Sequence, residues 1–376
     1  MYKLEEFVSL FNSIPLPYKV IQIPKYGLPP AQLDFSPGVF KHLMKTDDLS
    51  IDCLTNSGFH VESNAMISHI LIGRRFTQEK INTLNDFQKC SHFYGTHLIG
   101  AKDGFNYRMK ELQQRLGYPA PFYPLCLFPP DDYEELLKIW PTKPYWIIKA
   151  PALSRAREIR LASSKDEEAP KLPFIIEEYI SPPYLITGRK FDVRFYALVT
   201  SINPLIIYYH HHGLVLFATH QYNDKIENIK DLKIHLTNYE VNKDSETYIK
   251  SDDLTEKVEN SKWSLPFLWN YFESIGIDSK KLKKEMEDAS TAAIIAGMCS
   301  LRNLHNSNIK FHRKSSFELL GIDILLDQNL KPYILEINIS PSMQASSELD
   351  RMMKGELLHD TLQYSANASS LLTESK

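Results

Sequence analysis

The sequence predicts a mixed fold of the α/β (α+β) type, and three observations lead to this prediction. From about residue 56 to 145, strand-like pieces such as SHILIGRR alternate with helix-like pieces such as NYRMKELQQRL. From residue 145 the pattern changes to successive strands: YWIIKA, PFIIEEYI, KFDVRFYALVTS and PLIIYYHHHGLVLFAT. Residues 279–304 then predict one long helix, whose C-terminal half is apolar nearly all round and is therefore expected to be buried.

The pattern divides the chain into three parts. Residues 1–55 are rich in Pro and aromatic side chains with little periodicity, which predicts loops and short strands packed on a larger body. We expect an N-terminal and linker region over residues 1–145, a central and C-terminal region over residues 146–343, and a C-terminal helix with a disordered tail over residues 344–376.

Composition argues against several classes of protein. With 43% hydrophobic and 24% charged residues, the chain has the composition of an ordinary soluble globular protein. It has no apolar run of about 18 residues, and its N-terminus lacks a basic segment followed by an apolar one. We therefore expect neither a membrane partner nor a secretion signal. The four cysteines are far apart, which predicts a reducing compartment without a zinc site or disulfide framework. The net charge of −3 favours no nucleic-acid partner, and an acidic partner would need a local basic patch.

The segment IDILLDQNLKPYILEIN, residues 322–338, predicts a β-hairpin with acids inside its apolar strands. Two runs rich in β-branched and aromatic residues flank a link of turn formers. Alternation along the second strand puts Tyr333, Leu335 and Ile337 on one face, and Ile334, Glu336 and Asn338 on the other.

A pairing that brings Asp323 near Glu336 would place two carboxylates and the Asn338 amide within reach of one cation. Half-buried carboxylates side by side are costly, because like charges at close range resist joint ionisation. A divalent ion would remove that cost, and an all-oxygen set suits Mg²⁺ held jointly with phosphates. A solvated sheet face would show the same pattern, so the hairpin alone leaves both interpretations open.

Two further blocks carry charges inside strand patterns. YWIIKAP sets Lys149 at the end of an apolar strand, where it can present a point charge to a phosphate, and the next loop adds Arg155. In GRKFDVRFYALVTS, alternate positions put Lys190, Asp192 and Arg194 on one face, opposite an apolar wall. The alternative for Lys149 is a strand end in solvent. The alternative for the row on the second strand is a salt-bridge ladder on an exposed sheet.

The block HLTNYEVNK supplies Thr237 and Asn238, short hydrogen-bonding groups suited to a ribose or base, or to a plain turn. The triplet 210–212, HHH, does not predict a metal site, because consecutive residues on a strand or turn point apart. No Walker loop, kinase loop set or dinucleotide GxGxxG is present. In order, the blocks describe a nucleotide held between β-rich layers, with cations for phosphate and carboxylates for Mg²⁺.

This order of blocks resembles the tubulin tyrosine ligase-like family, and its glutamylating branch in particular, over most of the chain. The strongest blocks are GRKFDVRFYALVTS, HLTNYEVNK and FELLGIDILLDQNLKPYILEINISPS. The resemblance implies an ATP-grasp-like fold in which β-rich subdomains hold the nucleotide, with ATP and Mg²⁺ as cofactors. It implies Mg²⁺ ligands at Asp323, Glu336 and Asn338.

The resemblance also implies roles for other residues. The nucleotide contacts would be Lys102, Lys149, Arg155, Lys190, Phe191, Asp192, Thr237 and Asn238, with Glu177, Glu178, Tyr179 and Ile180 along the adenine. Catalytic positions would be Lys190, Asp192 and Arg194. Tyr239 and Lys262 would hold the incoming amino acid.

The chemistry implied by the resemblance is amide ligation onto the acidic tails of tubulin or microtubules. ATP would phosphorylate a glutamate side chain of the tail, and the amine of free L-glutamate would attack the acyl phosphate. Such phosphoryl transfer depends on positioning and charge neutralisation, which suits a site without a protein nucleophile. We expect a monomer in the cytoplasm on the cytoskeleton, with cilia and basal bodies as candidate locations.

Several positions depart from the family pattern. Ala156 and Glu158 stand in a loop where glycines are expected, and Leu216 replaces an Arg that would hold the amino acid's carboxylate. Glu240 is expected to add a negative charge to the same pocket. Glu177 and Glu178 replace a Gln and a basic residue.

These departures leave two hypotheses. The first is an active ligase in which Arg157 or Arg160 compensates for the missing cation. The second is a catalytically impaired pseudoenzyme of the same fold that binds tubulin or microtubules without modifying them. Retention of Asp323, Glu336 and Asn338 favours the first hypothesis.

Overall fold

The computed structural model describes residues 18–22, 38–42, 60–62, 64, 68, 70–73, 76–84, 88–100, 102–117, 120–149, 159–223, 228–250, 255–309 and 316–367. Within them, helices combine with largely antiparallel sheets, which confirms the α+β character predicted from the sequence. No helix in this described part is both long enough and apolar enough to cross a membrane.

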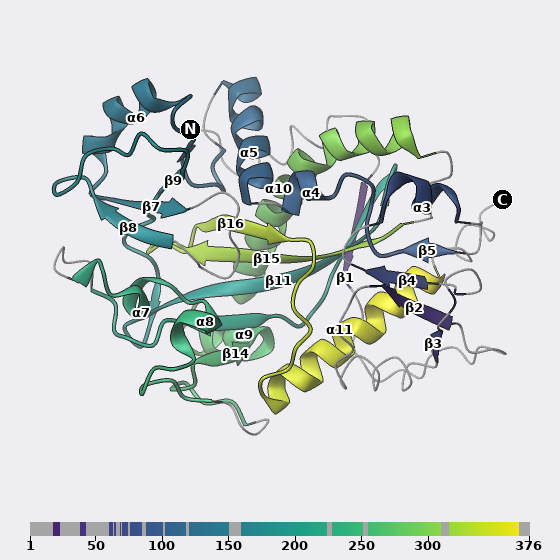
Figure 1. Cartoon of the computed structure of the whole chain (residues 1–376). Helices are drawn as coiled ribbons and strands as arrows, with labels where there is room; N and C mark the ends of the chain where they lie inside the picture. The colour runs from purple at the N-terminus through teal and green to yellow at the C-terminus, as the bar shows by residue number, and fades with distance from the viewer. Residues whose placement is uncertain are drawn as a thin grey trace.

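An eight-stranded sheet forms the centre of the molecule (Figure 1). Its strands are β1 (Tyr18–Gln22), β10 (Leu185–Ile186), β11 (Arg189–Ile202), β12 (Leu205–Tyr209), β13 (Leu214–Phe217), β14 (Lys262–Ser264), β15 (Glu318–Leu326) and β16 (Pro332–Asn338). The long strand β11 pairs antiparallel with β10, β12, β13 and β15, and β15 continues to β16. Only β1, which runs beside β12, is parallel to its described neighbour in this sheet.

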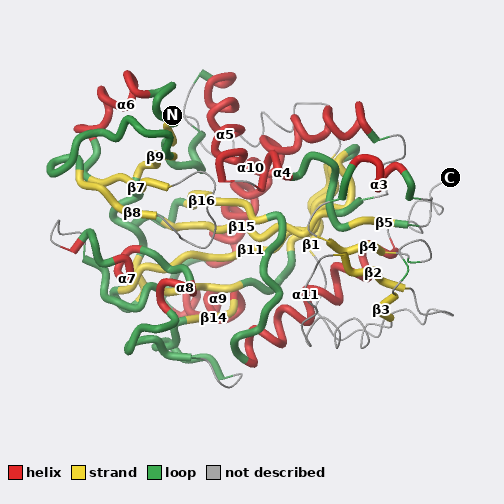
Figure 2. The backbone as a smooth tube through the Cα atoms, viewed as in Figure 1, coloured by secondary structure: helices red, strands yellow, loops and turns green. Residues whose placement is uncertain are grey.

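One face of the central sheet carries the main hydrophobic core. Phe191, Val193 and Phe195 of β11 point into it and pack with α5 (Lys102–Leu116), α9 (Leu265–Ser274) and α10 (Ser279–Asn308). The long helix predicted at 279–304 is therefore confirmed and runs four residues further. Its C-terminal half is buried as expected, and Figure 2 separates this helix from the strands by colour.

A second sheet, antiparallel with order β6-β9-β7-β8, lies to one side of the central sheet (Figure 1). Its strands are β6 (Cys126–Leu127), β7 (Tyr145–Lys149), β8 (Ile159–Ser163) and β9 (Ile175–Glu178). Alternation on β7 puts Trp146 and Ile148 under α6 (Tyr133–Ile139) and the turn η1 (Trp140–Thr142). The intervening Ile147 and Lys149 therefore face the other way, toward the central sheet.

The remaining elements surround these two sheets. A parallel sheet of β3 (His60–Glu62), β2 (Gly38–His42), β4 (Ile70–Gly73) and β5 (Lys89–Cys90) lies at the opposite end, near α3 (Gln78–Asn82). The short helix α4 (His97–Gly100) lies beside α5, α10 and β16. Short helices α7 (Leu232–His235) and α8 (Tyr239–Asn242) follow β13. The helix α11 (Glu348–Asn367) packs on Leu198 of β11 and Leu214 of β13. The disordered tail predicted after it lies outside the described residues.

The hairpin β15–β16 matches the predicted pairing but not the predicted faces of its second strand. Asp323 lies opposite Glu336, as expected, and the register then shifts between Asp323 and Ile324. This bulge places Leu335 and Glu336 together on the cleft, whereas Ile334 and Ile337 both enter the core. Strict alternation was therefore wrong here, because an extra residue in one strand reverses the side on which the following residues lie.

Candidate active site

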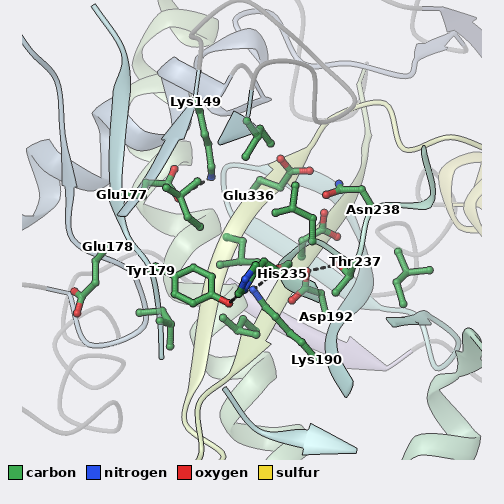
Figure 3. Close-up of a pocket in the computed structure, with 18 of the residues that line it drawn as sticks. Lys149, Glu177, Glu178, Tyr179, Lys190, Asp192, His235, Thr237, Asn238 and Glu336 are labelled. Atoms are coloured by element: carbon green, nitrogen blue, oxygen red, sulfur yellow. Dashed lines mark hydrogen bonds and ion pairs between the residues drawn. The ribbon is translucent and has the colours of Figure 1, made fainter. Parts of the chain in front are cut away.

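A cleft runs between the antiparallel four-stranded sheet and the central sheet (Figure 3). Strands β7, β8 and β9 line one side, and β11, β15 and β16 line the other. The lining includes thirteen of the residues singled out in the sequence: Lys149, Glu177, Glu178, Tyr179, Ile180, Lys190, Asp192, Arg194, Leu216, Thr237, Asn238, Asp323 and Glu336. Blocks that lie far apart in the sequence thus meet at one place.

The row predicted on β11 faces this cleft. Lys190 Nζ donates to the backbone oxygen of His235 at 2.9 Å and lies 4.8 Å from the ring centre of Tyr179. Thr237 Oγ1 donates to Asp192 Oδ2, while the buried Asp192 Oδ1 has no hydrogen-bond partner among the described residues. Burial lowers the pKa of Lys190 and raises the pKa of Asp192. Both side chains therefore favour a ligand that brings charge of the opposite sign.

Arg194 links this row to the hairpin. It lies opposite Asp323 in the register of β11 and β15, and its guanidinium donates to both carboxylate oxygens, with Nη2 at 2.8 Å from Oδ2. Burial opposes the charge of Arg194, but Asp323 outweighs burial, so the pKa of Arg194 is raised. This forked pair fixes Asp323 beside Glu336.

The two hairpin carboxyls respond to each other. Burial raises the pKa of Asp323 to about 7, against the opposing charge of Arg194. Burial would also raise the pKa of Glu336, but hydrogen bonds with Asp323 and Asn338 outweigh it and hold that pKa below its usual value. Asn338 Nδ2 donates to Glu336 Oε1 at 2.9 Å. Two adjacent buried carboxyls thus resist joint ionisation.

This set of groups fits a divalent cation such as Mg²⁺. Asp323 and Glu336 face each other on the cleft, and Asp192 Oδ1 is an unsatisfied buried oxygen in the same cleft. A cation there would neutralise the repulsion between the two carboxylates. Asn338 now turns its NH₂ group to the carboxylates, so it would need to rotate its amide to offer the oxygen.

Across the cleft, Lys149 is held by a buried network. Its Nζ donates to Glu177 Oε2 at 2.6 Å, and Asn106 Nδ2 donates to Glu177 Oε1 at 2.9 Å. Tyr123 Oη in turn donates to Asn106 Oδ1 at 2.7 Å. Burial would lower the pKa of Lys149, but Glu177 outweighs burial and raises it, so Lys149 stays charged. Figure 3 shows Lys149 pointing into the cleft between Glu177 and Glu336.

The other predicted nucleotide residues differ in how far they face the cleft. The side chain of Glu178 turns away to Lys143, with Nζ 2.5 Å from Oε1 (Figure 3). Tyr179 Oη lies 2.9 Å from His235 Nδ1, and Asn238 makes no capping hydrogen bond with its side chain at the start of α8. Phe191 requires a correction: its side chain is buried in the core on the opposite face of β11, so a nucleotide could meet only its backbone.

Tyr239 and Lys262, which were predicted to hold the amino acid, are not among the described residues that line the cleft, but Lys262 lies opposite the lining residue Leu216 in the register of β13 and β14. Lys262 Nζ lies 5.4 Å from the ring centre of Tyr239, so these two predicted residues do meet. Lys262 also pairs with buried Asp350 of α11 at 2.8 Å. Leu216 lines the cleft as expected. Glu240, however, is exposed and pairs with Lys243 at 2.6 Å, which corrects the expectation that it adds charge to this pocket.

Two cations contact Asp350. Lys354 lies one turn further along α11, with Nζ 3.7 Å from Asp350 Oδ1, and donates to the backbone oxygen of Gln344. Burial lowers the pKa of Lys354 to about 8, and the charges of Lys262 and Arg194 act in the same direction. Leu216 packs against the same helix α11 that carries Lys354. Because burial opposes the charge of Lys354, this lysine is a candidate partner for a substrate carboxylate.

Some predicted residues fall outside the description. Arg155, Ala156, Arg157 and Glu158 lie outside the described residues, and only the backbone of Lys102, at the start of α5, is described. Arg160 is described and is exposed on β8, where Nη1 pairs with Glu167 at 2.6 Å. It therefore cannot compensate for Leu216 from inside the cleft.

The histidine triplet 210–212 lies outside the cleft and contradicts the expectation that its rings point apart. The turn between β12 and β13 gathers them, with the ring centres of His211 and His212 4.0 Å apart. A tight turn does not follow the alternation of a strand, which is why strand geometry gave the wrong arrangement.

Sequence reasoning missed His235, Asn106 and Asp350, which contact predicted residues directly, and Lys354, which contacts Asp350. Asp350 and Lys354 are four residues apart, a spacing that on a helix usually marks a solvated pair. Only the packing of α11 on the sheet buries them.

Comparison with known proteins adds to this geometry. Residues 79–373 match the model of the tubulin-tyrosine ligase family. The chain is 36% identical over 293 residues to mouse tubulin monoglutamylase TTLL4, covering 77% of this chain and 24% of that protein. It is 34% identical over 311 residues to Caenorhabditis briggsae tubulin polyglutamylase ttll-4, covering 82% and 51%. It is 32% identical over 323 residues to human tubulin polyglutamylase TTLL5, covering 85% and 25%. The chain thus spans about a quarter to about a half of the length of these relatives.

Proposed function

The chain belongs to the tubulin-tyrosine ligase family, and on that premise we propose that its cleft uses Mg-ATP to join free glutamate to glutamate side chains in tubulin tails. The observation that carries this proposal is the row Arg194–Asp323–Glu336 on one wall of the cleft, facing Lys149 on the other. The relatives named as tubulin glutamylases support the choice of acceptor and amino acid.

Each wall of the cleft has a role in this proposal. Lys149 and Lys190 bind nucleotide phosphates, and Glu177 positions Lys149 for that contact. Asp323, Glu336 and the Asn338 oxygen hold Mg²⁺, which supplies neutralisation of phosphate charge when bound. Thr237 orients Asp192 through its hydroxyl. The apolar Ile147, Ile180, Leu325 and Leu335 offer walls for the base.

The ligation proceeds through an acyl phosphate on the acceptor side chain. The acceptor carboxylate oxygen attacks the γ-phosphorus and ADP leaves; the glutamate amine then attacks the acyl carbon, releasing phosphate and one proton. Arg194 and the lysines stabilise the charges that the two attacks develop. This route needs no nucleophile from the protein. The site of action would be the cytoskeleton, with cilia and basal bodies as candidate locations. The proposal also includes a division of the chain into three regions, with boundaries at residues 145 and 343.

We assign the carboxylate of incoming glutamate to Lys262 and Lys354, in place of the cation missing at Leu216. Because burial brings the pKa of Lys354 to about 8, its charge is present below that pH and is lost above it. The KM for glutamate should therefore rise between about pH 7 and about pH 9. Lys354→Met should raise KM roughly 10- to 150-fold, the loss of one charge-assisted contact, and remove this pH dependence.

The control for this prediction is Lys354→Arg, which keeps a positive charge throughout the range. It should retain a low KM and show no rise with pH. Initial rates at varied glutamate give the measurement, and an unchanged KM in Lys354→Met would exclude this assignment.

A second candidate function is a pseudoenzyme that binds tubulin without modifying it. One observation favours it: Lys262 is already paired with buried Asp350, so a substrate carboxylate must share or displace that partner. One assay distinguishes the ligase from the pseudoenzyme. The chain is incubated with tubulin, Mg-ATP and labelled glutamate or labelled tyrosine. We expect ATP-dependent label in tubulin from glutamate and much less from tyrosine, whereas no label from either would favour the pseudoenzyme.

A further inference from the structure

The turn 210–212 faces α11 and is fixed by its first histidine. His210 Nδ1 accepts from the backbone N–H of His212 at 3.1 Å, so Nε2 carries the proton and donates to Asp360 Oδ2 at 3.0 Å. The His210 side chain is 1% exposed, which leaves this arrangement little freedom. Both ring nitrogens of His210 are thus committed, and the backbone of the turn is tied to the helix.

The next two histidines meet one carboxylate of the same helix. His212 Nε2 lies 2.6 Å and His211 Nε2 3.9 Å from Glu356 Oε2. The three side chains are 14–18% exposed, and one potential ligand atom from each lies within 4.8 Å of the others. The Nδ1 atoms of His211 and His212 are buried and have no hydrogen-bond partner among the described residues. The cluster therefore has donor atoms close together on two separate elements.

Two imidazoles and a carboxylate are a ligand set for a borderline divalent ion. Tetrahedral Zn²⁺ binds such atoms at about 2.0–2.2 Å, which puts ligand atoms roughly 3.3 Å apart. The two distances to Glu356 lie on either side of that value. The pair His210–Asp360 ties the backbone of the turn to α11 next to the cluster.

The ionisation of the cluster is also compatible with a metal. Burial, together with the two neighbouring histidines, lowers the pKa of His211 to about 4, so its ring is neutral at pH 7.

We propose that His211, His212 and Glu356 form a binding site for a transition-metal ion of the Zn²⁺ class, distinct from the oxygen-only Mg²⁺ site. The bound ion fastens the β12–β13 turn to α11. Since α11 also carries Asp350, which pairs with Lys262, and Lys354, which pairs with Asp350, the ion steadies the helix that borders the proposed amino-acid site. The inference does not depend on the ligase activity, because the cluster and its metal lie outside the cleft.

The test titrates the full chain with ZnCl₂ after removal of metals with EDTA, in excess MgCl₂ so that the oxygen-only site is occupied by Mg²⁺. We expect one-to-one binding by calorimetry and a rise of several degrees in the melting temperature, because a ligand that binds only the folded chain stabilises it. Co²⁺ should give the visible absorption of a nitrogen- and oxygen-ligated ion of low symmetry. No ATP, glutamate or tubulin is present, so the result is independent of the proposed function.

Matched variants locate the ion. His212→Gln and Glu356→Gln keep the approximate shapes and should each weaken Zn²⁺ binding at least ~10-fold. His220→Gln is the control, because His220 pairs with Asp231 at 2.7 Å outside the cluster and should bind Zn²⁺ as the unmodified chain does. Circular dichroism confirms folding of each variant before titration. The proposal would be overturned if the unmodified chain showed no one-to-one binding, or if folded Glu356→Gln and His212→Gln bound Zn²⁺ as tightly as the unmodified chain.

Discussion

Glu336→Gln should lower the rate of glutamate ligation by roughly 10²- to 10³-fold, the usual cost of losing one preorganised electrostatic contact in an active site. The substitution keeps the shape of the side chain and its hydrogen bond from Asn338 but removes one of two carboxylate charges. Because the folded chain lowers the pKa of Glu336, removing this charge should also cost some folding stability, so rates are compared only after circular dichroism shows that the variant is folded. The Mg²⁺ concentration for half-maximal rate should rise together with the loss of rate.

Asp327→Asn is the matched control. Asp327 belongs to the same hairpin but accepts backbone N–H groups of Asn329 and Lys331 in the turn, away from the cleft. It should leave the rate and the Mg²⁺ requirement near those of the unmodified chain. Equal activity of Glu336→Gln and Asp327→Asn would contradict the assignment of Glu336.

The second large effect is on folding stability, and it should differ between two adjacent glutamates, Glu177 and Glu178. Glu177→Ala should lower the free energy of unfolding by about 3–5 kcal/mol, because it leaves the ammonium of Lys149 buried without its partner. The Glu177 side chain is 2% exposed and that of Lys149 12%. Glu178→Ala removes a pair with Lys143 whose side chains are 23% and 40% exposed, and should cost at most ~1 kcal/mol.

Urea unfolding of both variants gives the comparison, provided that the dependence on denaturant concentration is the same. Glu177→Gln adds an intermediate case, because the amide keeps hydrogen bonding but not the charge. Equal losses in Glu177→Ala and Glu178→Ala would mean that the buried pair does not hold Lys149 in place. A parallel measurement of Mg-ATP binding should show that only the Glu177 variants bind it more weakly.

Local sequence patterns were sufficient to predict the arrangement of many cleft residues. Alternation alone placed Lys190, Asp192 and Arg194 on one face, because β11 is regular where these residues lie. The hairpin pairing of Asp323 with Glu336 also followed from the two apolar runs and their link. Both are contacts within one strand or between neighbouring strands, where the spacing of residues fixes the geometry.

Other features required tertiary information. No residue type in the sequence indicates the bulge after Asp323, yet this bulge places Leu335 on the cleft. Glu177 was expected along the adenine, but its contacts come from β7 and α5, which only folding brings beside β9. Glu240 was misplaced for a local reason: on helix α8 it faces Lys243 three residues later, a pairing visible once the helix is recognised.

The central claim is that this cleft ligates glutamate onto tubulin tails with Mg-ATP. Its most direct test is mass spectrometry of tail peptides after incubation of tubulin with Mg-ATP, glutamate and either the unmodified chain or Glu336→Gln. We predict tail peptides heavier by whole glutamate residues, with fragmentation placing the addition on a glutamate side chain, only with the unmodified chain. Unmodified tails in every sample, from a chain whose melting temperature Mg-ATP still raises, would contradict the claim.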